Sequence, residues 1–387
     1  MSKPRIGLFT FYTGNYGACL QAFATQRYVR EKLGGECVIV RTDPGVRGDT
    51  PWTRLFLRGG IFHGPLAKIR RRLRRRTPVA SAFAERLSVR VEAFKRFERD
   101  CLVLDENQNR LFSEYYRNPP DYDIYLSGSD QVWNPLAFSR CNPIYYLDIA
   151  PLGRPRVSYA SSFAISEVPL RYLREMKRFL TRFDRISVRE NDGARIVERL
   201  TGRRPPVVVD PTFLLTREDW LRVSGKSTMV PEEPYILFYR LGTFSYFDWF
   251  KEHILEKTRM RPVVIPIRAE DDPTGDGEYN AGPLDFVSLL ARAALVVTDS
   301  FHGVALSVNL GVPFYALLRQ DPAIKGNMNS RVLFLLERLR LNDRLVLPRT
   351  KFLDAPSFEA PAADSSELSA WRDVSAGYLA EILGRNH

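Results

Sequence analysis

Short runs of apolar and β-branched residues alternate with helix-like segments, and this alternation constrains the fold more than any other feature of the chain. The first series of runs lies at residues 5–11, 36–41, 123–128, 156–162, 185–190 and 206–210. A second series follows a proline-rich join, at residues 235–242, 261–267, 294–300 and 312–318. Such runs, separated by helices, predict parallel sheets covered on both faces. The sequence therefore predicts an α/β protein.

The length favours two domains, because 387 residues exceed what one hydrophobic core usually serves. We predict an N-terminal Rossmann-like domain at 1–211, with a basic helical insertion at about 50–104. A second Rossmann-like domain is predicted at 212–365, and a helix at 366–387 is expected to pack back on the first domain. Two doubly wound domains facing a cleft form a GT-B-like fold.

The net charge of +12 is concentrated in one basic run, KIRRRLRRR at residues 68–76. A solvated helix face is the usual explanation of such a run. Attraction to an anionic membrane surface is the alternative that we keep, at about 1 kcal/mol per basic residue near the surface. No RNP, zinc-finger or helix-turn-helix signature accompanies the run, so we predict no nucleic-acid partner.

Several features predict a cytoplasmic protein, with the inner face of the membrane as the alternative through the basic run. The N-terminal apolar run is too short for a signal peptide, and no run reaches the roughly 20 apolar residues of a membrane span. The four cysteines lie far apart and are expected to be reduced thiols. With only four histidines beside them, no metal site is predicted.

Polar residues follow several of the predicted strands, at the ends where open α/β sheets bind ligands. The turn TGNYG, residues 13–17, could cradle a phosphate or serve only tight packing. In SGSDQVWN, residues 127–134, the ring of Trp133 could stack on a sugar. Alternatively, Ser129 or Asp130 only caps a turn. Both explanations stay open for both segments.

Two further segments carry a charged or titratable side chain. Arg189 in SVRE either pairs with a surface carboxylate or offers its planar guanidinium to an anionic ligand. His302 in TDSFHG is expected in the first turn of a helix, where the helix end disfavours imidazolium by roughly 0.3 to 1 kcal/mol. A bound anion would favour the protonated ring, which suits a general acid. The alternative is a histidine hydrogen-bonded in a turn.

Seven segments, taken in order, resemble the polysaccharide pyruvyl transferase family. They are NYGACLQAFATQ, DIYLSGSDQVWN, SYASSFA, SVRENDGA, VVVDPTFLL, VVTDSFHGVALSVNLGVPFYAL and NSRVLFLLERL. The resemblance implies a GT-B-like fold and transfer of pyruvate from phosphoenolpyruvate to a sugar, which gives a pyruvate ketal. The acceptor sugar would belong to a cell-surface polysaccharide or to its lipid-linked or nucleotide-linked precursor.

The resemblance also implies roles for single residues. The phosphoenolpyruvate contacts of the family map to Arg189 and His302, with Ser300, Phe301 and Gly303 beside the histidine. Some members have an arginine at the position of Ser300, and its replacement here is expected among Arg240, Arg268 and Arg331. We expect the acceptor sugar at Asn15, Tyr16, Ser129, Gln131 and Trp133.

The implied chemistry needs a proton on the methylene carbon of phosphoenolpyruvate, attack of a hydroxyl on C2, and loss of phosphate. His302 could supply the proton or assist the departing phosphate, and Asp130 could accept the proton of the attacking hydroxyl. No cofactor is expected. Two alternatives are a GT-B glycosyltransferase with a nucleotide-sugar donor, and a non-catalytic protein that binds anionic surfaces through residues 68–76.

Overall fold

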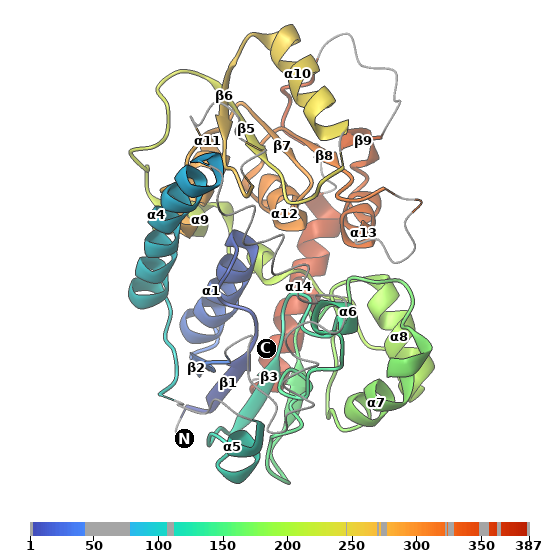
Figure 1. The fold of residues 1–387 in the computed structure, drawn as a ribbon. Helices are drawn as coiled ribbons and strands as arrows, with labels where there is room; N and C mark the ends of the chain where they lie inside the picture. The colour runs from blue at the N-terminus through green and yellow to red at the C-terminus, as the bar shows by residue number, and fades with distance from the viewer. Residues whose placement is uncertain are drawn as a thin grey trace. The chain divides into compact units, whose positions relative to one another are not determined.

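Two compact units, each with one parallel sheet, make up the computed structural model (Figure 1). It describes residues 3–42, 78–106, 112–244, 246–268, 271, 277–321, 323, 329–347, 356–361 and 365–384. Unit 1 comprises Met1–Thr77, Glu98–Leu214 and Trp371–His387, and unit 2 comprises Pro78–Phe97 and Leu215–Ala370. The predicted α/β class is confirmed. The basic run at 68–76 lies outside the described residues.

The sheet of unit 1 has four parallel strands in the order β2-β1-β3-β4. The strands are β1 (Arg5–Phe9), β2 (Glu36–Ile39), β3 (Ile124–Ser127) and β4 (Arg156–Ser158). The helices of this unit are α1 (Tyr16–Glu31), α5 (Phe112–Arg117), α6 (Pro135–Phe138), α7 (Leu170–Leu180), α8 (Asn191–Thr201) and the short 3-10 helix η2 (Pro211–Phe213). Two helices, α4 (Pro78–Cys101) and α14 (Ser365–Ile382), have residues in both units.

The predicted strands at 185–190 and 206–210 are absent as strands. Each contributes only single β-bridges, Val157 to Arg185, Ser161 to Val188, and Val188 to Val207. Serine side chains take part in the hydrogen bonding here: the Ser187 N–H donates to Ser158 Oγ at 3.0 Å, and the Ala160 N–H donates to Ser187 Oγ at 3.2 Å. The segments therefore extend the sheet without forming a regular ladder.

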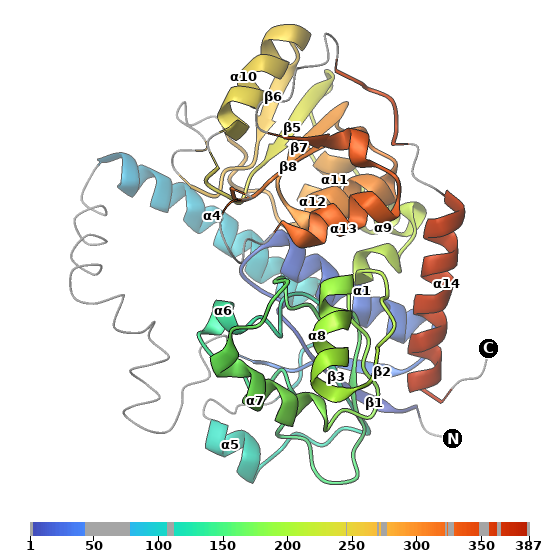
Figure 2. The ribbon, with the colours of Figure 1, turned by 90° about the vertical axis from the view of Figure 1, so that its right-hand side faces the viewer.

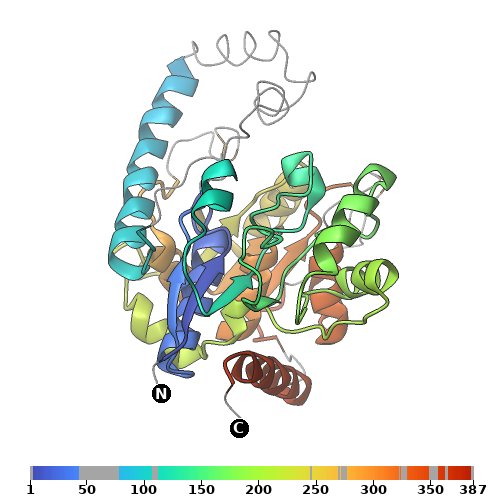
Figure 3. The same ribbon diagram turned by 90° about the horizontal axis from the view of Figure 1, so that it is seen from below.

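The helix α14 packs beside these bridged segments of unit 1, and Figure 3 looks along its axis. The Trp371 indole N–H donates to the carbonyl of Val207 at 2.8 Å, and the Val209 N–H donates to Ser375 Oγ at 2.9 Å. These bonds satisfy backbone groups that a further strand would otherwise pair. The contacts place Trp371–His387 with unit 1.

The sheet of unit 2 has five parallel strands in the order β6-β5-β7-β8-β9. They are β5 (Tyr235–Tyr239), β6 (Arg261–Val264), β7 (Leu295–Thr298), β8 (Phe314–Leu317) and β9 (Leu345–Val346), of which the two-residue β9 was not predicted. The helices are α9 (Arg217–Ser224), α10 (Tyr246–Thr258), α11 (Pro283–Arg292), α12 (Phe301–Leu310), α13 (Ser330–Arg338) and the 3-10 helix η4 (Asn342–Arg344).

Helices cover both faces of the unit 2 sheet, as the continuous apolar strands predict (Figure 2). On one face, Phe247 and Phe250 of α10 pack into a core with Ile236 and Phe238 of β5. On the other, the α11 and α12 helices contact each other, and α12 contacts β7 and β8. Both faces of β5 are consequently buried.

The strand order locates the most favourable ligand site in each sheet. Numbered within each unit, the order begins 2-1-3-4, the doubly wound arrangement in which successive connections leave the central strand in opposite directions. The reversal lies between β1 and β3 in unit 1 and between β5 and β7 in unit 2. Ligands of open α/β sheets bind beyond the carboxyl ends of the strands at this point.

Candidate active site

The turn that carries His302 follows β7 at the carboxyl edge of the unit 2 sheet. Ser300 has extended backbone angles, and its Oγ accepts the N–H of Gly303 at 3.3 Å. Ser300 is thus the N-cap of the α12 helix, which begins at Phe301. His302 lies in the first turn, as the sequence predicts, and 7% of the residue is exposed. The conformation of the turn is therefore fixed by the Ser300 cap and by the burial of α12.

Gly303 allows the first turn of α12 to lie against the end of β7. A Cβ at this position would meet Thr298 Oγ1 at 2.7 Å and Thr298 Cγ2 at 2.9 Å. Thr298 cannot easily move, because its Oγ1 donates to the carbonyl of Tyr239 at 2.6 Å and accepts the N–H of Ser300 at 3.0 Å. Only glycine leaves room for this approach.

Replacement of Gly303 by alanine is expected to destabilise the protein by about 1–3 kcal/mol, because the new methyl group overpacks the Thr298 contact. The matched control is Gly377→Ala in α14, where an added Cβ meets nothing within 4 Å. That change should stabilise its helix by roughly 0.5–1 kcal/mol. Urea unfolding of both variants measures the two effects, and a Gly303→Ala midpoint at or above that of the wild type would contradict this packing.

Asp299, which follows β7, forms hydrogen bonds to the loop that follows β5. Its carboxylate accepts the backbone N–H of Leu241 at 2.6 Å and of Gly242 at 2.7 Å, and the residue is 3% exposed. Burial raises the pKa of Asp299, and the two N–H groups and the charges of Arg319 and Arg240 lower it in part. These loops flank the reversal point of the strand order.

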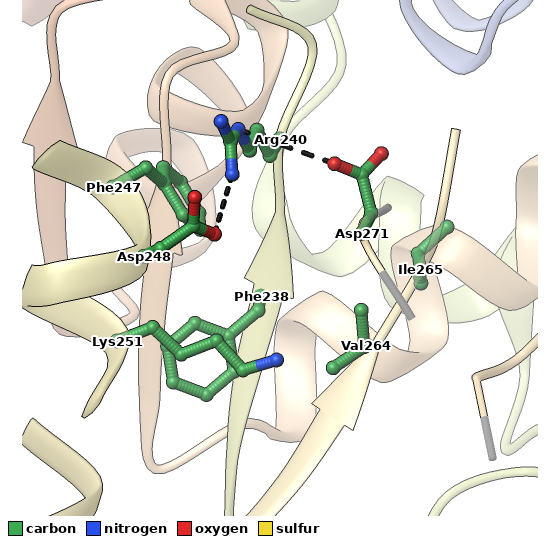
Figure 4. Close-up of a pocket in the computed structure, with 8 residues that line it drawn as sticks. All are labelled: Phe238, Arg240, Phe247, Asp248, Lys251, Val264, Ile265 and Asp271. Carbon is green, nitrogen blue, oxygen red and sulfur yellow. Dashed lines mark hydrogen bonds and ion pairs between the residues drawn. The ribbon is translucent and has the colours of Figure 1, made fainter. Parts of the chain in front are cut away.

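Arg240 lines a small pocket at the carboxyl ends of β5 and β6 (Figure 4). Its guanidinium is 2.6 Å from Asp248 and 4.0 Å from Asp271, and it donates to the carbonyl of Gly242 at 3.0 Å. Arg268 lies 2.7 Å from the same Asp271 carboxylate. Carboxylates already engage both of these predicted anion-binding arginines.

Arg331 of α13 packs on Phe301, the first residue of α12. Its guanidinium carbon lies 5.6 Å from the ring centroid of Phe301, and the residue is 4% exposed. Such a cation–π contact stabilises the packing of Phe301, which is itself 7% exposed. The burial of Arg331 favours a packing role over the predicted anion contact.

Arg189 is buried in unit 1 among three carboxylates. Its guanidinium lies 2.6 Å from Asp210, 3.3 Å from Asp130 and 3.9 Å from Glu190. Burial alone lowers the pKa of Arg189, but the three carboxylates outweigh burial and raise it above the ordinary value. With a side chain 1% exposed, Arg189 is neither the predicted surface pair nor a guanidinium open to a ligand.

The buried carboxylates organise the segments that follow neighbouring strands. Glu190 Oε1 accepts the hydroxyl of Ser162 at 2.9 Å and the backbone N–H of Phe163 at 3.0 Å. Asp210 caps the helix η2 by accepting the N–H of Thr212 at 3.0 Å. The charge cluster therefore holds the carboxyl edge of unit 1 together.

In the segment SGSDQVWN, the structure contradicts two of the predicted roles. Trp133 is 1% exposed and its ring stacks on Tyr146 with centroids 5.6 Å apart, so it is not available to stack on a sugar. Asp130 is 4% exposed and paired with Arg189, which stabilises its charge and makes it a poor base. Ser129 is fully buried, and its hydroxyl donates to the carbonyl of Ala160 at 2.7 Å.

The remaining predicted acceptor residues, Asn15, Tyr16 and Gln131, differ in their exposure to solvent. Asn15 is exposed and caps α1, its Oδ1 accepting the N–H of Ala18 at 2.8 Å, whereas Tyr16 is 1% exposed. Gln131 is partly exposed and its Oε1 accepts the side-chain N–H of Asn134 at 3.1 Å. Of the predicted acceptor set, Asn15 and Gln131 are the accessible members.

Four charged residues that the sequence did not predict as site residues lie at the two carboxyl edges. They are Glu190, Asp210, Asp299 and Arg319, each at the end of a predicted strand or directly after one. Their positions were visible in the sequence, but their partners are set by tertiary packing. In the described ranges, no group of three or more histidine, cysteine or acidic side chains is arranged to hold a metal ion. No described helix is both long and apolar enough to span a membrane.

Solved structures similar to this chain include sugar-nucleotide enzymes of low identity. A putative UDP-N-acetylglucosamine 2-epimerase from Listeria monocytogenes shares 12% identity, with 100% of this chain and 99% of that chain covered and a TM-score of 0.46. The UDP-GlcNAc 2-epimerase from Neisseria meningitidis, bound to UDP-GlcNAc, shares 9%, with coverage of 99% and 94% and a TM-score of 0.43. The E. coli heptosyltransferase WaaC shares 14%, with coverage of 86% and 99% and a TM-score of 0.35.

The sequence itself identifies the family. No curated protein matches the chain. The family model described as polysaccharide pyruvyl transferase, however, matches residues 15–321, which is most of the chain and includes the α12 turn. The chain belongs to the polysaccharide pyruvyl transferase family.

Proposed function

We propose that this protein transfers the pyruvyl group of phosphoenolpyruvate to a sugar, forming a pyruvate ketal and releasing phosphate. The acceptor is a cell-surface polysaccharide or its lipid-linked or nucleotide-linked precursor. The observation that carries the proposal is the position of His302, in the first turn of α12 beside the reversal point of the unit 2 sheet, within the residues matched by the family model.

The surroundings of His302 suit an anionic donor. The first turn of a helix presents backbone N–H donors and the positive end of the helix dipole. The ten residues of α12 are all buried, and Asp299 holds the neighbouring loop by two short hydrogen bonds. A rigid site of this kind can stabilise developing charge without first reorganising.

The proposed reaction is an addition followed by a substitution at C2 of phosphoenolpyruvate. In the first step, a sugar hydroxyl bonds to C2 and loses its proton while the C2–C3 double bond opens and C3 gains a proton, which gives a phosphorylated ketal. In the second, another hydroxyl of the sugar bonds to C2, the C2–O bond to phosphate breaks, and a proton is released. His302, as imidazolium, donates the proton to C3 or to the departing phosphate.

Arg189 has a structural role in this proposal. Its buried guanidinium orients Asp130 and Asp210, and so shapes the loops at the carboxyl edge of unit 1. The accessible side chains on that edge that remain from the predicted acceptor set are Asn15 and Gln131. We propose these two as contacts for the sugar hydroxyl groups.

Transfer in D₂O tests the proposed chemistry. Phosphoenolpyruvate is incubated with the protein and a panel of nucleotide-linked, lipid-linked and polymeric glycans, and products are analysed by mass spectrometry and NMR. The expected product carries a pyruvate ketal whose methyl group has gained one deuterium, together with an equal amount of free phosphate. Transfer of a glycosyl group from UDP-sugars in the same panel, without use of phosphoenolpyruvate, would contradict the proposal.

A further inference from the structure

Binding of phosphoenolpyruvate at the carboxyl edge of unit 2 would be favoured by a cationic side chain that can reach it. Phosphoenolpyruvate carries a carboxylate and a phosphate, whereas the turn from Ser300 to Gly303 contains only one titratable side chain, His302. The arginines predicted for this purpose are already engaged or buried: Arg240 and Arg268 bind carboxylates, and Arg331 packs on a phenylalanine ring.

Arg319 lies at the same edge and differs from these three. It follows β8, whose Ala316 pairs with Thr298 of β7, so the two strands end side by side. The residue is partly exposed. Within the residues that the structure describes, no hydrogen bond or ion pair engages the guanidinium of Arg319.

The backbone that carries Arg319 is held on two sides. A Cβ on Gly242 would lie 2.1 Å from the carbonyl oxygen of Arg319 and 2.9 Å from its Cγ, so the residue packs directly on this glycine. The next residue, Gln320, exchanges two hydrogen bonds with the side chain of Asn329, at 3.2 Å and 2.8 Å. The stem is therefore positioned while its charged end is left available.

The loop against which Arg319 packs is itself fixed to the start of the His302 turn. Gly242 donates its N–H to Asp299, the residue directly before Ser300. The charge of Arg319 also acts on Asp299, where it lowers a pKa that burial raises. The packing on Gly242 and the hydrogen bond from Gly242 to Asp299 therefore connect Arg319 to the residue just before the N-cap of α12.

We propose that Arg319 binds the anionic donor, pairing its guanidinium with the carboxylate or the phosphate of phosphoenolpyruvate beside the first turn of α12. A planar guanidinium can form two parallel hydrogen bonds to either group. This inference rests on the proposed function, since it names a binding residue for the same donor.

Calorimetric titration of phosphoenolpyruvate into the full-length wild type, Arg319→Ala and Arg319→Lys tests the inference. Arg319→Ala should raise the Kd roughly 10- to 100-fold, because a charge-assisted hydrogen bond is lost. Arg319→Lys keeps the positive charge but not the planar guanidinium, so its Kd should lie between those of the wild type and Arg319→Ala. The urea midpoint of Arg319→Ala should stay close to that of the wild type, since the described fold loses no hydrogen bond or ion pair and only the longer-range charge interaction with Asp299.

Arg261→Ala is the matched control, because Arg261 is exposed at the amino end of β6, on the opposite edge of the same sheet. Its Kd should stay within about twofold of the wild type, since a distant exposed charge is screened. An unchanged Kd in Arg319→Ala, with normal binding by the wild type, overturns the inference alone. Weaker binding with a large fall in the urea midpoint, beyond what loss of the charge interaction with Asp299 explains, would make Arg319 a structural residue and overturn it as well. No saturable binding by the wild type, either alone or with each acceptor sugar present, would overturn the proposed function, and the inference with it.

Discussion

Replacing His302 by glutamine should lower pyruvyl transfer by roughly 10²- to 10⁴-fold, the usual contribution of a general acid. Glutamine is similar in size and still forms hydrogen bonds, but it cannot deliver a proton at neutral pH. The serine cap and the buried helix α12 do not depend on the imidazole, so the fold should persist. Initial rates of phosphate release in the presence of acceptor measure the loss.

A matched control is His253→Gln, the same substitution in α10 of the same unit. That ring lies against Trp249 with centroids 6.2 Å apart, and no part of the proposed reaction uses it. The control should retain the rate of the wild type. A normal urea midpoint together with near-normal turnover in His302→Gln would show that His302 is not the general acid.

Replacing Arg189 by methionine should destabilise the protein by about 3–5 kcal/mol, the cost of breaking a buried ion pair by removing one partner. The side chains of Asp130, Asp210 and Glu190 are between 0% and 6% exposed, and they would be left without their shared cation. Urea unfolding measures the change. Arg189→Lys should recover only part of it, because one ammonium group cannot replace the planar guanidinium.

The contrasting variant is Arg204→Met, which removes an exposed ion pair. Arg204 lies 2.6 Å from Glu198, but the two side chains are 56% and 43% exposed. Such pairs contribute about 0–1 kcal/mol, so this midpoint should barely move. Equal midpoints for the Arg189 and Arg204 variants would contradict the description of the buried cluster as a structural centre of unit 1.

The regular part of the fold could be predicted from the sequence because buried parallel strands leave a strong apolar signal. The runs at 235–242 and 294–300 became β5 and β7, which are buried along their whole length. The runs at 185–190 and 206–210 carry a similar signal but form single bridges. The hydroxyl groups of Ser158 and Ser187 take over backbone hydrogen bonds at the first run, and Trp371 and Ser375 of α14 do so at the second. Two-residue β9 is too short to give a pattern.

The sequence could predict where the candidate site residues lie in the fold, but not which way their side chains point. The sequence placed His302 in the first helical turn after a strand, and the structure has it there. It also placed Arg189 and Trp133 after strands, yet both are buried, because partners far along the chain decide which way a side chain points. Glu190 and Asp210 become partners of Arg189 only once three segments lie side by side.

Calorimetric titration of phosphoenolpyruvate into the wild-type protein, with UDP and UDP-sugars in parallel, shows which of them is the donor. Phosphoenolpyruvate should bind saturably to the wild type and more weakly to His302→Ala. Repeating the titration with each sugar present covers an ordered mechanism in which the acceptor binds first. Binding of a UDP-sugar, with no binding of phosphoenolpyruvate even in its presence, would contradict the claim that phosphoenolpyruvate is the donor.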